Sequence, residues 1–190
     1  MRRAAVAMAA LVAVGTAVAQ APPFAWDIPA PFPKPPVPAD NPMRAAKVEL
    51  GRRLFYDRRM SVNGAQSCAS CHRQELAFTD GPARAVGTTG EMHPRGSMSL
   101  ANIGYSPALT WADPVTTALE AQALVPMFGT EPVELGLRGM EGRFLAVLQR
   151  DSVYQRLFSR AFPESSSAGD RYTIANVVKA IAAFERTLVS

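Results

Sequence analysis

The feature that most constrains this chain is the pentapeptide Cys68-Ala69-Ser70-Cys71-His72, which contains both of its cysteines and one of its two histidines. Two thiols three positions apart on a short helical turn can each add across a vinyl group of haem, and the imidazole that follows can bind the iron. The pattern therefore predicts a covalent haem c site, with Cys68 and Cys71 as thioether anchors and His72 as the axial ligand.

Three other interpretations of the pentapeptide are open. A redox-active Cys-x-x-Cys motif is typical of a thioredoxin-like alternation of strands and helices, whereas the flanking sequence is rich in Arg, Ala, Gly and Pro. A structural zinc site needs four protein ligands, and beyond these three side chains only His93 and scattered carboxylates remain. A structural disulfide would leave His72 without a role. Haem attachment is favoured because it uses all three side chains.

The N-terminus predicts export. Arg2 and Arg3 precede an apolar run over residues 4–14, and Ala17-Val18-Ala19 fits the small-x-small rule of signal peptidase. We expect a signal peptide at 1–19, whose removal leaves 171 of the 190 residues. The apolar run is shorter than a membrane span, so we expect the mature chain to lie in the bacterial periplasm with no membrane span.

Charge and length add two further limits. The formal net charge is +4, and it falls to about +2 when Arg2 and Arg3 leave with the signal peptide, so nucleic-acid binding is not suggested. The mature length suits one domain with a core. Residues 22–42 contain nine prolines, which exclude regular helix and central strand. We expect an extended proline-rich arm over 20–42 that lies along a globular haem domain over 43–190.

The apolar periodicity of residues 43–190 predicts helices and almost no strand. One helix is expected to begin after Asn41, as its N-cap, and to end near Asp57. A second is expected over 115–125, and a third over 143–148 that continues beyond Asp151.

The last predicted helix has the clearest apolar face. Thr173 is its expected N-cap, and the apolar residues on one face are Ile174, Val177, Val178, Ile181, Phe184 and Leu188. Together with the scarcity of alternating β-branched runs, these helices predict an all-α c-type cytochrome domain with long ordered loops. The loop over 78–112 is where such a domain would hold the distal pocket of its haem.

Further motifs surround the pentapeptide in a recognisable order. They are Leu50-Gly51-Arg52-Arg53-Leu54-Phe55-Tyr56-Asp57, Met60-Ser61, Phe78-Thr79-Asp80-Gly81, Ser99-Leu100-Ala101-Asn102, Trp111, Gln122-Ala123-Leu124-Val125-Pro126 and Pro132-Val133-Glu134. In this order they resemble the first haem domain of bacterial di-haem cytochrome c peroxidases and their MauG-type relatives. Within that family, Ser97-Met98-Ser99-Leu100 and Val125-Pro126-Met127-Phe128-Gly129 look most like the di-haem enzymes associated with methanobactin gene clusters.

The resemblance implies an oxidoreductase that uses hydrogen peroxide to oxidise a small periplasmic electron-transfer protein or an aromatic residue of a protein substrate. Glu134 resembles the family's distal glutamate, which moves a proton between the two peroxide oxygens, and Gln122 resembles the glutamine beside it. Trp111 resembles the tryptophan that relays oxidising equivalents between the two haems. Each assignment has a simpler alternative. Glu134 could be a solvated loop carboxylate that is confused with the nearby Glu131, Gln122 a polar residue on a helix surface, and Trp111 an ordinary half-buried tryptophan.

Two more residues receive weaker assignments from the resemblance. His93 has roughly the spacing of a histidine that binds the first haem iron in some peroxidases and leaves on activation, although a surface histidine is an equal alternative. Asn102 matches an asparagine near an interdomain calcium ion.

The resemblance also predicts a second haem domain with its own Cys-x-x-Cys-His motif, and no such motif follows before Ser190. The sequence is interpreted either as part of a longer di-haem enzyme or as a single-haem relative. The alternative function is a periplasmic electron carrier with one haem and no peroxidase activity. In that carrier an internal residue, either His93 or a methionine, would close the sixth position of the iron.

Overall fold

The computed structural model describes residues 23–111 and 113–190, so the expected signal peptide at 1–19 lies outside the described residues. Within the described residues β structure is limited to two isolated bridges, and the predicted all-α class is confirmed. The helices are α1 Ala45–Tyr56, α2 Cys68–Cys71, α3 Leu119–Gln122, α4 Leu124–Phe128, α5 Glu141–Arg150, α6 Ser152–Ala161, α7 Ala168–Arg171 and α8 Ile174–Glu185, and 3-10 turns occur at Arg58–Met60, Gln74–Leu76 and Ile103–Tyr105. None of these helices is long and apolar enough to cross a membrane.

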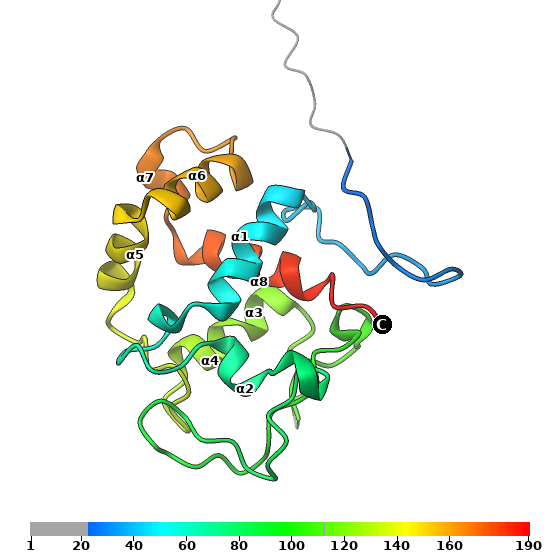
Figure 1. The fold of residues 1–190 in the computed structure, drawn as a ribbon, viewed down its shortest axis with the longest axis vertical. Helices are drawn as coiled ribbons and strands as arrows, with labels where there is room; N and C mark the ends of the chain where they lie inside the picture. Colours follow the sequence, from blue (N-terminus) through cyan, green and yellow to red (C-terminus); the bar gives the residue numbers. More distant parts are fainter. Residues whose placement is uncertain (1–22, 112) are drawn as a thin grey trace, which may run out of the picture.

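Helices α1 and α8 come from opposite ends of the described chain and pack against each other at the centre of the molecule (Figure 1). Gly51 permits this approach, because a Cβ atom there would overlap the carbonyl oxygen of Ala180. The rings of Phe55 and Phe184 meet edge to face with centroids 5.2 Å apart. Since α2 also packs on α1 and α3 packs on α8, this helix pair positions the segments that carry the Cys-x-x-Cys-His motif and Gln122.

The prediction for the C-terminal helix holds in detail. Thr173 caps α8 by accepting a hydrogen bond from the Asn176 amide at 3.1 Å, and the apolar face of α8 from Val177 to Phe184 is buried. The helix expected over 143–148 and beyond Asp151 is instead two helices, α5 and α6, because Asp151 ends the first and caps the second.

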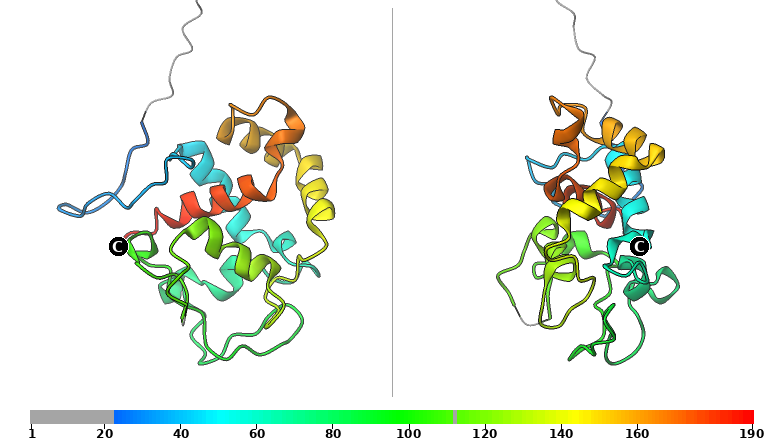
Figure 2. Two further views of the ribbon diagram at one scale, coloured as in Figure 1. Left: turned by 180° about the vertical axis from the view of Figure 1, so that it is seen from behind. Right: turned by 90° about the vertical axis from the view of Figure 1, so that its left-hand side faces the viewer.

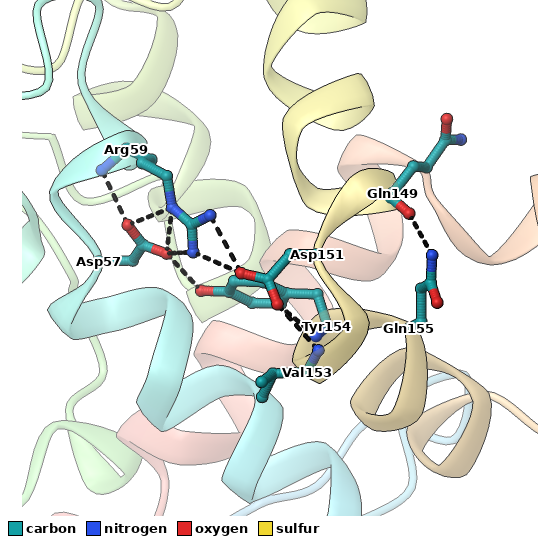
Figure 3. Close-up of polar contacts among 7 residues, drawn as sticks. All are labelled: Asp57, Arg59, Gln149, Asp151, Val153, Tyr154 and Gln155. Carbon is teal, nitrogen blue, oxygen red and sulfur yellow. Dashed lines mark hydrogen bonds and ion pairs between the residues drawn. The ribbon is translucent and has the colours of Figure 1, made fainter.

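A polar cluster joins the end of α1 to the start of α6 (Figure 3). The Asp57 carboxylate accepts hydrogen bonds from Arg59 Nη2 at 2.6 Å and from the Tyr154 hydroxyl at 2.7 Å. Asp151 accepts from Arg59 Nη1 at 3.1 Å and also caps α6 through the Val153 amide at 2.8 Å. The buried Tyr154 ring thereby anchors α6 against α1.

The prediction that Asn41 caps the first helix is wrong. The N-cap residue of α1 is Arg44, which makes no side-chain cap hydrogen bond. The Asn41 side chain is fully buried and bonds instead to Glu120 at 2.6 Å and to the Lys47 amine at 2.8 Å. These long-range partners compete successfully with local capping.

The predicted start of the second helix is also wrong. Helix α3 begins at Leu119, and Val115 is 82% exposed. The Asp113 carboxylate accepts hydrogen bonds from the Val115 amide at 2.8 Å and from the Thr116 hydroxyl at 2.8 Å. These local bonds hold a turn where the apolar spacing suggested a helix.

The proline-rich arm has no regular secondary structure over the described residues 23–42. Its later part contacts the helical body, because the Tyr105 hydroxyl donates to the Pro33 carbonyl at 2.6 Å and Arg186 Nε donates to the Pro36 carbonyl at 3.2 Å. The first described residues, in dark blue, extend away from the helices in both orientations (Figures 1 and 2).

Candidate haem site

Helix α2 holds the two cysteines of the pentapeptide, and both are free thiols with no disulfide between them. The turn is tied at its start, where the Ser67 amide donates to Ser70 Oγ at 2.9 Å. Burial raises the pKa of the Cys68 and Cys71 thiols, so both are neutral at pH 7. A redox-active Cys-x-x-Cys motif needs the opposite, a lowered thiol pKa, and this geometry therefore speaks against that alternative.

His72 lies at the C-terminal end of α2 with one ring nitrogen occupied. Its Nδ1 is 2.8 Å from the Phe78 carbonyl oxygen, so Nδ1 carries the proton and donates, which places the lone pair on Nε2; the Met98 backbone also lies near the ring. Burial lowers the pKa of His72 and favours the neutral imidazole. A neutral ring oriented by a backbone carbonyl is the arrangement that metal-binding histidines use.

Cys68, Cys71 and His72 all line one cavity of about 330 Å³. Its walls come from α2, the loop over 85–98, the segment over 100–111, helices α3 and α4, residues 132–135 and the last turn of α8. The four other predicted residues Trp111, Gln122, Glu134 and His93 line this same cavity. Groups that lie up to 66 positions apart along the chain therefore line the same cavity as His72.

Glu134, and not Glu131, belongs to the cavity. Glu131 is exposed and does not line the cavity, whereas Glu134 is half-buried within its wall. Burial raises the pKa of Glu134, and His93 partly counteracts this shift. The backbone of Glu134 is held by the Thr88 amide, which donates to its carbonyl oxygen at 2.8 Å.

The loop that carries His93 is clamped to the Glu134 segment. A Cβ atom at Gly87 would overlap the Val133 carbonyl oxygen, so only glycine allows the two segments this approach. The Val133 amide donates to Glu91 Oε2 at 3.0 Å, and the His93 amide donates to the Ala85 carbonyl at 2.9 Å. The buried His93 Nε2 has no hydrogen-bond partner among the described residues.

Trp111 stands at the mouth of the cavity and is 57% exposed. Its indole Nε1 donates to the Gly96 carbonyl at 2.9 Å, and the Arg95 guanidinium lies 5.8 Å from the ring centroid. These two contacts fix the ring while they leave one side open to solvent.

Asn102 is not part of the cavity lining. Its side chain pairs with Ser190, donating to Oγ and accepting from the backbone amide, both at 3.1 Å. In the part of the chain that the structure describes, no three His, Cys, Asp or Glu side chains gather as a metal-ion site, which gives no support to the structural zinc alternative. Calcium binding at Asn102 remains a prediction from the resemblance.

The sequence analysis missed Glu185, which lines the cavity from the last turn of α8. It is 5% exposed, its Oε2 atom has no hydrogen-bond partner, and burial raises its pKa to about 8. A signal was present in the sequence, because Glu185 follows Ile181 by four positions and therefore continues the apolar face of α8. The apolar pattern was interpreted as a core face, and the acidic residue on it was passed over.

The cavity fits a covalently bound haem. Two neutral thiols and an imidazole line one largely apolar space, which is the donor set that haem c requires. Among the described residues, three buried side-chain atoms lack a partner, and two of them, His93 Nε2 and Glu185 Oε2, belong to cavity-lining residues. Polar groups left unpaired in native proteins usually meet a ligand or water.

Comparison with known proteins agrees with this geometry. The sequence profile described as di-haem cytochrome c peroxidase matches residues 45–190. The chain is 38% identical over 166 residues to cytochrome-c peroxidase IdrP1 of Denitromonas iodatirespirans, covering 84% of this chain and 40% of the relative. It is 37% identical over 155 residues to methylamine utilization protein MauG of Methylorubrum extorquens, covering 82% and 41%. A crystal structure of a MauG-like protein associated with microbial copper homeostasis superposes with a TM-score of 0.83 at 45% identity, covering 88% of this chain and 47% of that one.

The fold, the cavity and these matches define the class of protein as a c-type cytochrome. The chain belongs to the di-haem cytochrome c peroxidase family, which includes MauG. It spans about 40% of the length of the curated relatives it matches. The predicted family is confirmed.

Proposed function

We propose that this chain is the peroxide-reactive haem domain of an exported di-haem peroxidase or MauG-type enzyme, with one haem c attached through Cys68 and Cys71 and bound by His72. The observation that carries the proposal is that Glu134 and Gln122 line the same cavity as Cys68, Cys71 and His72. Family membership supports haem c as the cofactor. An N-terminal signal peptide and periplasmic location complete the proposal, since haem c is attached outside the bacterial cytoplasm.

Haem, when bound, supplies the iron at which peroxide is reduced and the macrocycle that conducts electrons to it. Glu134 takes the proton from the peroxide oxygen nearer the iron and returns it to the outer oxygen, which then leaves as water. Its raised pKa moves it toward the working pH, where a carboxyl group both accepts and donates a proton efficiently. Gln122, at the end of α3, orients the peroxide or the water beside it.

Reduction of one hydrogen peroxide to two water molecules consumes two electrons and two protons. We assign the entry of these electrons to Trp111, because its ring lies at the cavity mouth and is largely exposed. The electrons come from a small periplasmic redox protein or from an aromatic side chain of a protein substrate. The resemblance of residues 97–100 and 125–129 to the methanobactin-associated enzymes favours the second source, with a tryptophan of a partner protein as the substrate.

The decisive experiment compares two neighbouring carboxylates. In the haem-loaded protein, Glu134→Gln should slow the reaction with peroxide by about 10²–10⁴-fold, because it removes the proton carrier without changing the side-chain shape. Glu131→Gln is the matched control, since Glu131 is exposed outside the cavity, and it should leave the rate unchanged. Stopped-flow recording of the Soret band measures both, and an unchanged rate in Glu134→Gln would remove Glu134 from the mechanism.

The unpaired Nε2 of His93 favours a second candidate function. If His93 closed the sixth position of the iron permanently, the domain would be a single-haem electron carrier. That protein would have a low-spin spectrum in both redox states and would not react with peroxide. A high-spin oxidised spectrum that changes with peroxide in the wild type, and is unaltered in His93→Ala, would exclude the carrier.

A further inference from the structure

Glu185 is a buried carboxyl group that nothing in the proposed reaction uses. It ends α8, where the α1–α8 contact buries it to 5% exposure, and its side chain lines the cavity. Its Oε2 atom finds no hydrogen-bond partner among the described residues. A buried carboxyl group in this situation is stable only when it is protonated or when a positive charge is brought near it.

The adjacent arginine only partly offsets the effect of burial on the pKa of Glu185, because its guanidinium is paired with another carboxylate. Arg186 directs its guanidinium to the other side of the helix end, where Nη1 and Nη2 donate to the Glu120 carboxylate at 2.8 and 2.9 Å. Its Nε donates to the Pro36 carbonyl at 3.2 Å. The positive charge of Arg186 is therefore neutralised by Glu120, and Glu185 keeps no ionic partner of its own.

Other ionisable groups near Glu185 come from α1, α2, α3, the flank of α8 and the remaining cavity wall. They are Lys47, Tyr56, Cys68, Cys71, His72, His93, Arg95, Glu120, Glu134 and Arg186. The Lys47 amine donates to Asn41 and to the Pro42 carbonyl, and the two thiols and His72 are consumed when haem binds. Glu134 differs from Glu185 because it is only half-buried and is influenced by His93.

We propose that Glu185 is a proton-binding positioning residue of the haem site, which takes up one proton when the bound iron is reduced and releases it when the iron is oxidised. The inference rests on the proposed haem binding. It extends the proposed function, because it assigns a role to the α8 wall of the cavity.

The sign of the coupling follows from charge. Oxidised iron adds one positive charge to the cavity, and in this poorly solvated space that charge favours the Glu185 carboxylate. When one electron arrives from the donor protein, that charge is cancelled, and the carboxylate binds one proton from solvent so that the cavity gains no net charge. Glu185 should thus bind its proton about tenfold more tightly in the reduced protein, which lowers the midpoint potential by about 59 mV between acidic and alkaline pH.

The test is a potentiometric titration of the haem-loaded full chain at several pH values. The optical signal of this haem is assigned as the one lost in the Cys68→Ala/Cys71→Ala variant. Wild type should show the fall in midpoint potential with pH, Glu185→Gln should abolish it, and the conservative Glu185→Asp should retain it. Glu131→Gln is the comparison variant, because Glu131 is exposed outside the cavity, and it should keep the wild-type pH dependence. A wild-type pH dependence in Glu185→Gln would overturn the proposal.

A second measurement covers the case in which Glu185→Gln does not fold or bind haem. The redox-difference infrared spectrum of wild-type protein should gain a protonated-carboxyl C=O band on reduction, and the same band should appear in Glu134→Gln. Absence of the band in wild type, or its loss in Glu134→Gln, would overturn the proposal. Intact mass after denaturation is measured first, because failure to find haem on Cys68 and Cys71 refutes the proposed function, whereas haem without proton coupling refutes only the role of Glu185.

Discussion

Two groups of buried polar side chains lie on either side of the last turn of α8, and they differ in how they are satisfied. The paired cluster consists of Asn41, Lys47, Glu120 and Arg186. Asn41 donates to Glu120 at 2.6 Å and accepts from Lys47 at 2.8 Å, and Glu120 receives both Nη atoms of Arg186. Burial lowers the pKa of Lys47 to about 8, and the amine keeps two hydrogen bonds.

The cavity cluster consists of Cys68, Cys71, His93, Glu134 and Glu185. Here burial raises the pKa of both thiols and both carboxyl groups, and two side-chain atoms have no partner. The paired cluster stabilises the fold by itself and connects the arm to α3 and α8. The polar groups of the cavity cluster are all satisfied only when the protein binds a further group. The two clusters adjoin at the end of α8, where Glu185 belongs to the cavity cluster and Arg186 to the paired cluster.

The largest effect on the cavity cluster should come from preventing haem attachment. Cys68→Ala/Cys71→Ala should abolish covalent haem and leave the cavity cluster without the group that covers it. Mass spectrometry of the denatured protein should show no attached haem, and the unfolding free energy should fall by several kcal/mol because the burial of the haem in the cavity and the His72–iron bond are lost. The single variant Cys71→Ala is the control, since one thioether and His72 remain. Haem that stays covalently attached to the double variant would contradict the assignment.

The next largest effect should come from removing the buried ion pair between Glu120 and Arg186 in the paired cluster. Glu120→Gln leaves the 4% exposed Arg186 without its carboxylate, and breaking a buried ion pair in this way costs about 3–5 kcal/mol. Glu49→Gln is the matched control, because Glu49 and Arg52 form an exposed pair 3.4 Å apart whose removal should cost less than about 1 kcal/mol. Urea unfolding measures both. Equal losses would show that the buried cluster contributes no more than a surface pair.

The paired cluster also shows which contacts could not be predicted from the sequence. The cap of α8 was predicted because Thr173 bonds to an amide only three residues away, and the thiols and His72 were found because they lie within one pentapeptide. Asn41 and Glu120 are 79 positions apart, and no local sequence pattern predicts the hydrogen bond between them. Asn41 was therefore assigned to the nearest helix start, where its side chain makes no bond.

For the cavity, the resemblance identified Gln122 on α3 and Glu134, Trp111 and His93 on loops, whereas Glu185 on α8 was missed. Glu134 and Glu131 could not be separated by spacing alone, because which of two loop carboxylates turns inward depends on the clamp made by Gly87 and Val133. Glu185 was not predicted because the apolar spacing of α8 indicated only a core face. Its burial depends on how α1 and α8 pack at Gly51, which the sequence of α8 does not show.

A smaller effect should follow from loosening that clamp. Gly87→Ala forces the Val133 segment away and should cost about 1–3 kcal/mol of stability. It should slow the peroxide reaction as well, since Glu134 moves with Val133. Gly142→Ala is the control, because a Cβ atom there meets nothing within 4 Å in helix α5, and it should be neutral or stabilise the protein by up to about 1 kcal/mol. A stability loss with an unchanged peroxide rate would separate the clamp from the chemistry.

The most gradual predicted effect, spread over several pH units, is a pH slope that distinguishes the two clusters. Burial raises the folded pKa of Glu185 from 4.5 to about 8, so between these values the folded protein holds a proton that the unfolded chain has released. Unfolding free energy should therefore fall as the pH rises through this window, by at most about 1.4 kcal/mol per pH unit. Glu120 behaves oppositely: burial acts to raise its pKa, but the bonds from Arg186 and Asn41 outweigh this and lower it, so its contribution disappears as the pH falls below 4.5. Urea unfolding of the reduced, haem-loaded protein should show the slope in wild type and not in Glu185→Gln, while the loss of stability in acid persists in both. A slope that survives in Glu185→Gln would place the buried proton on another group of the cavity cluster, with Glu134 as the next to test.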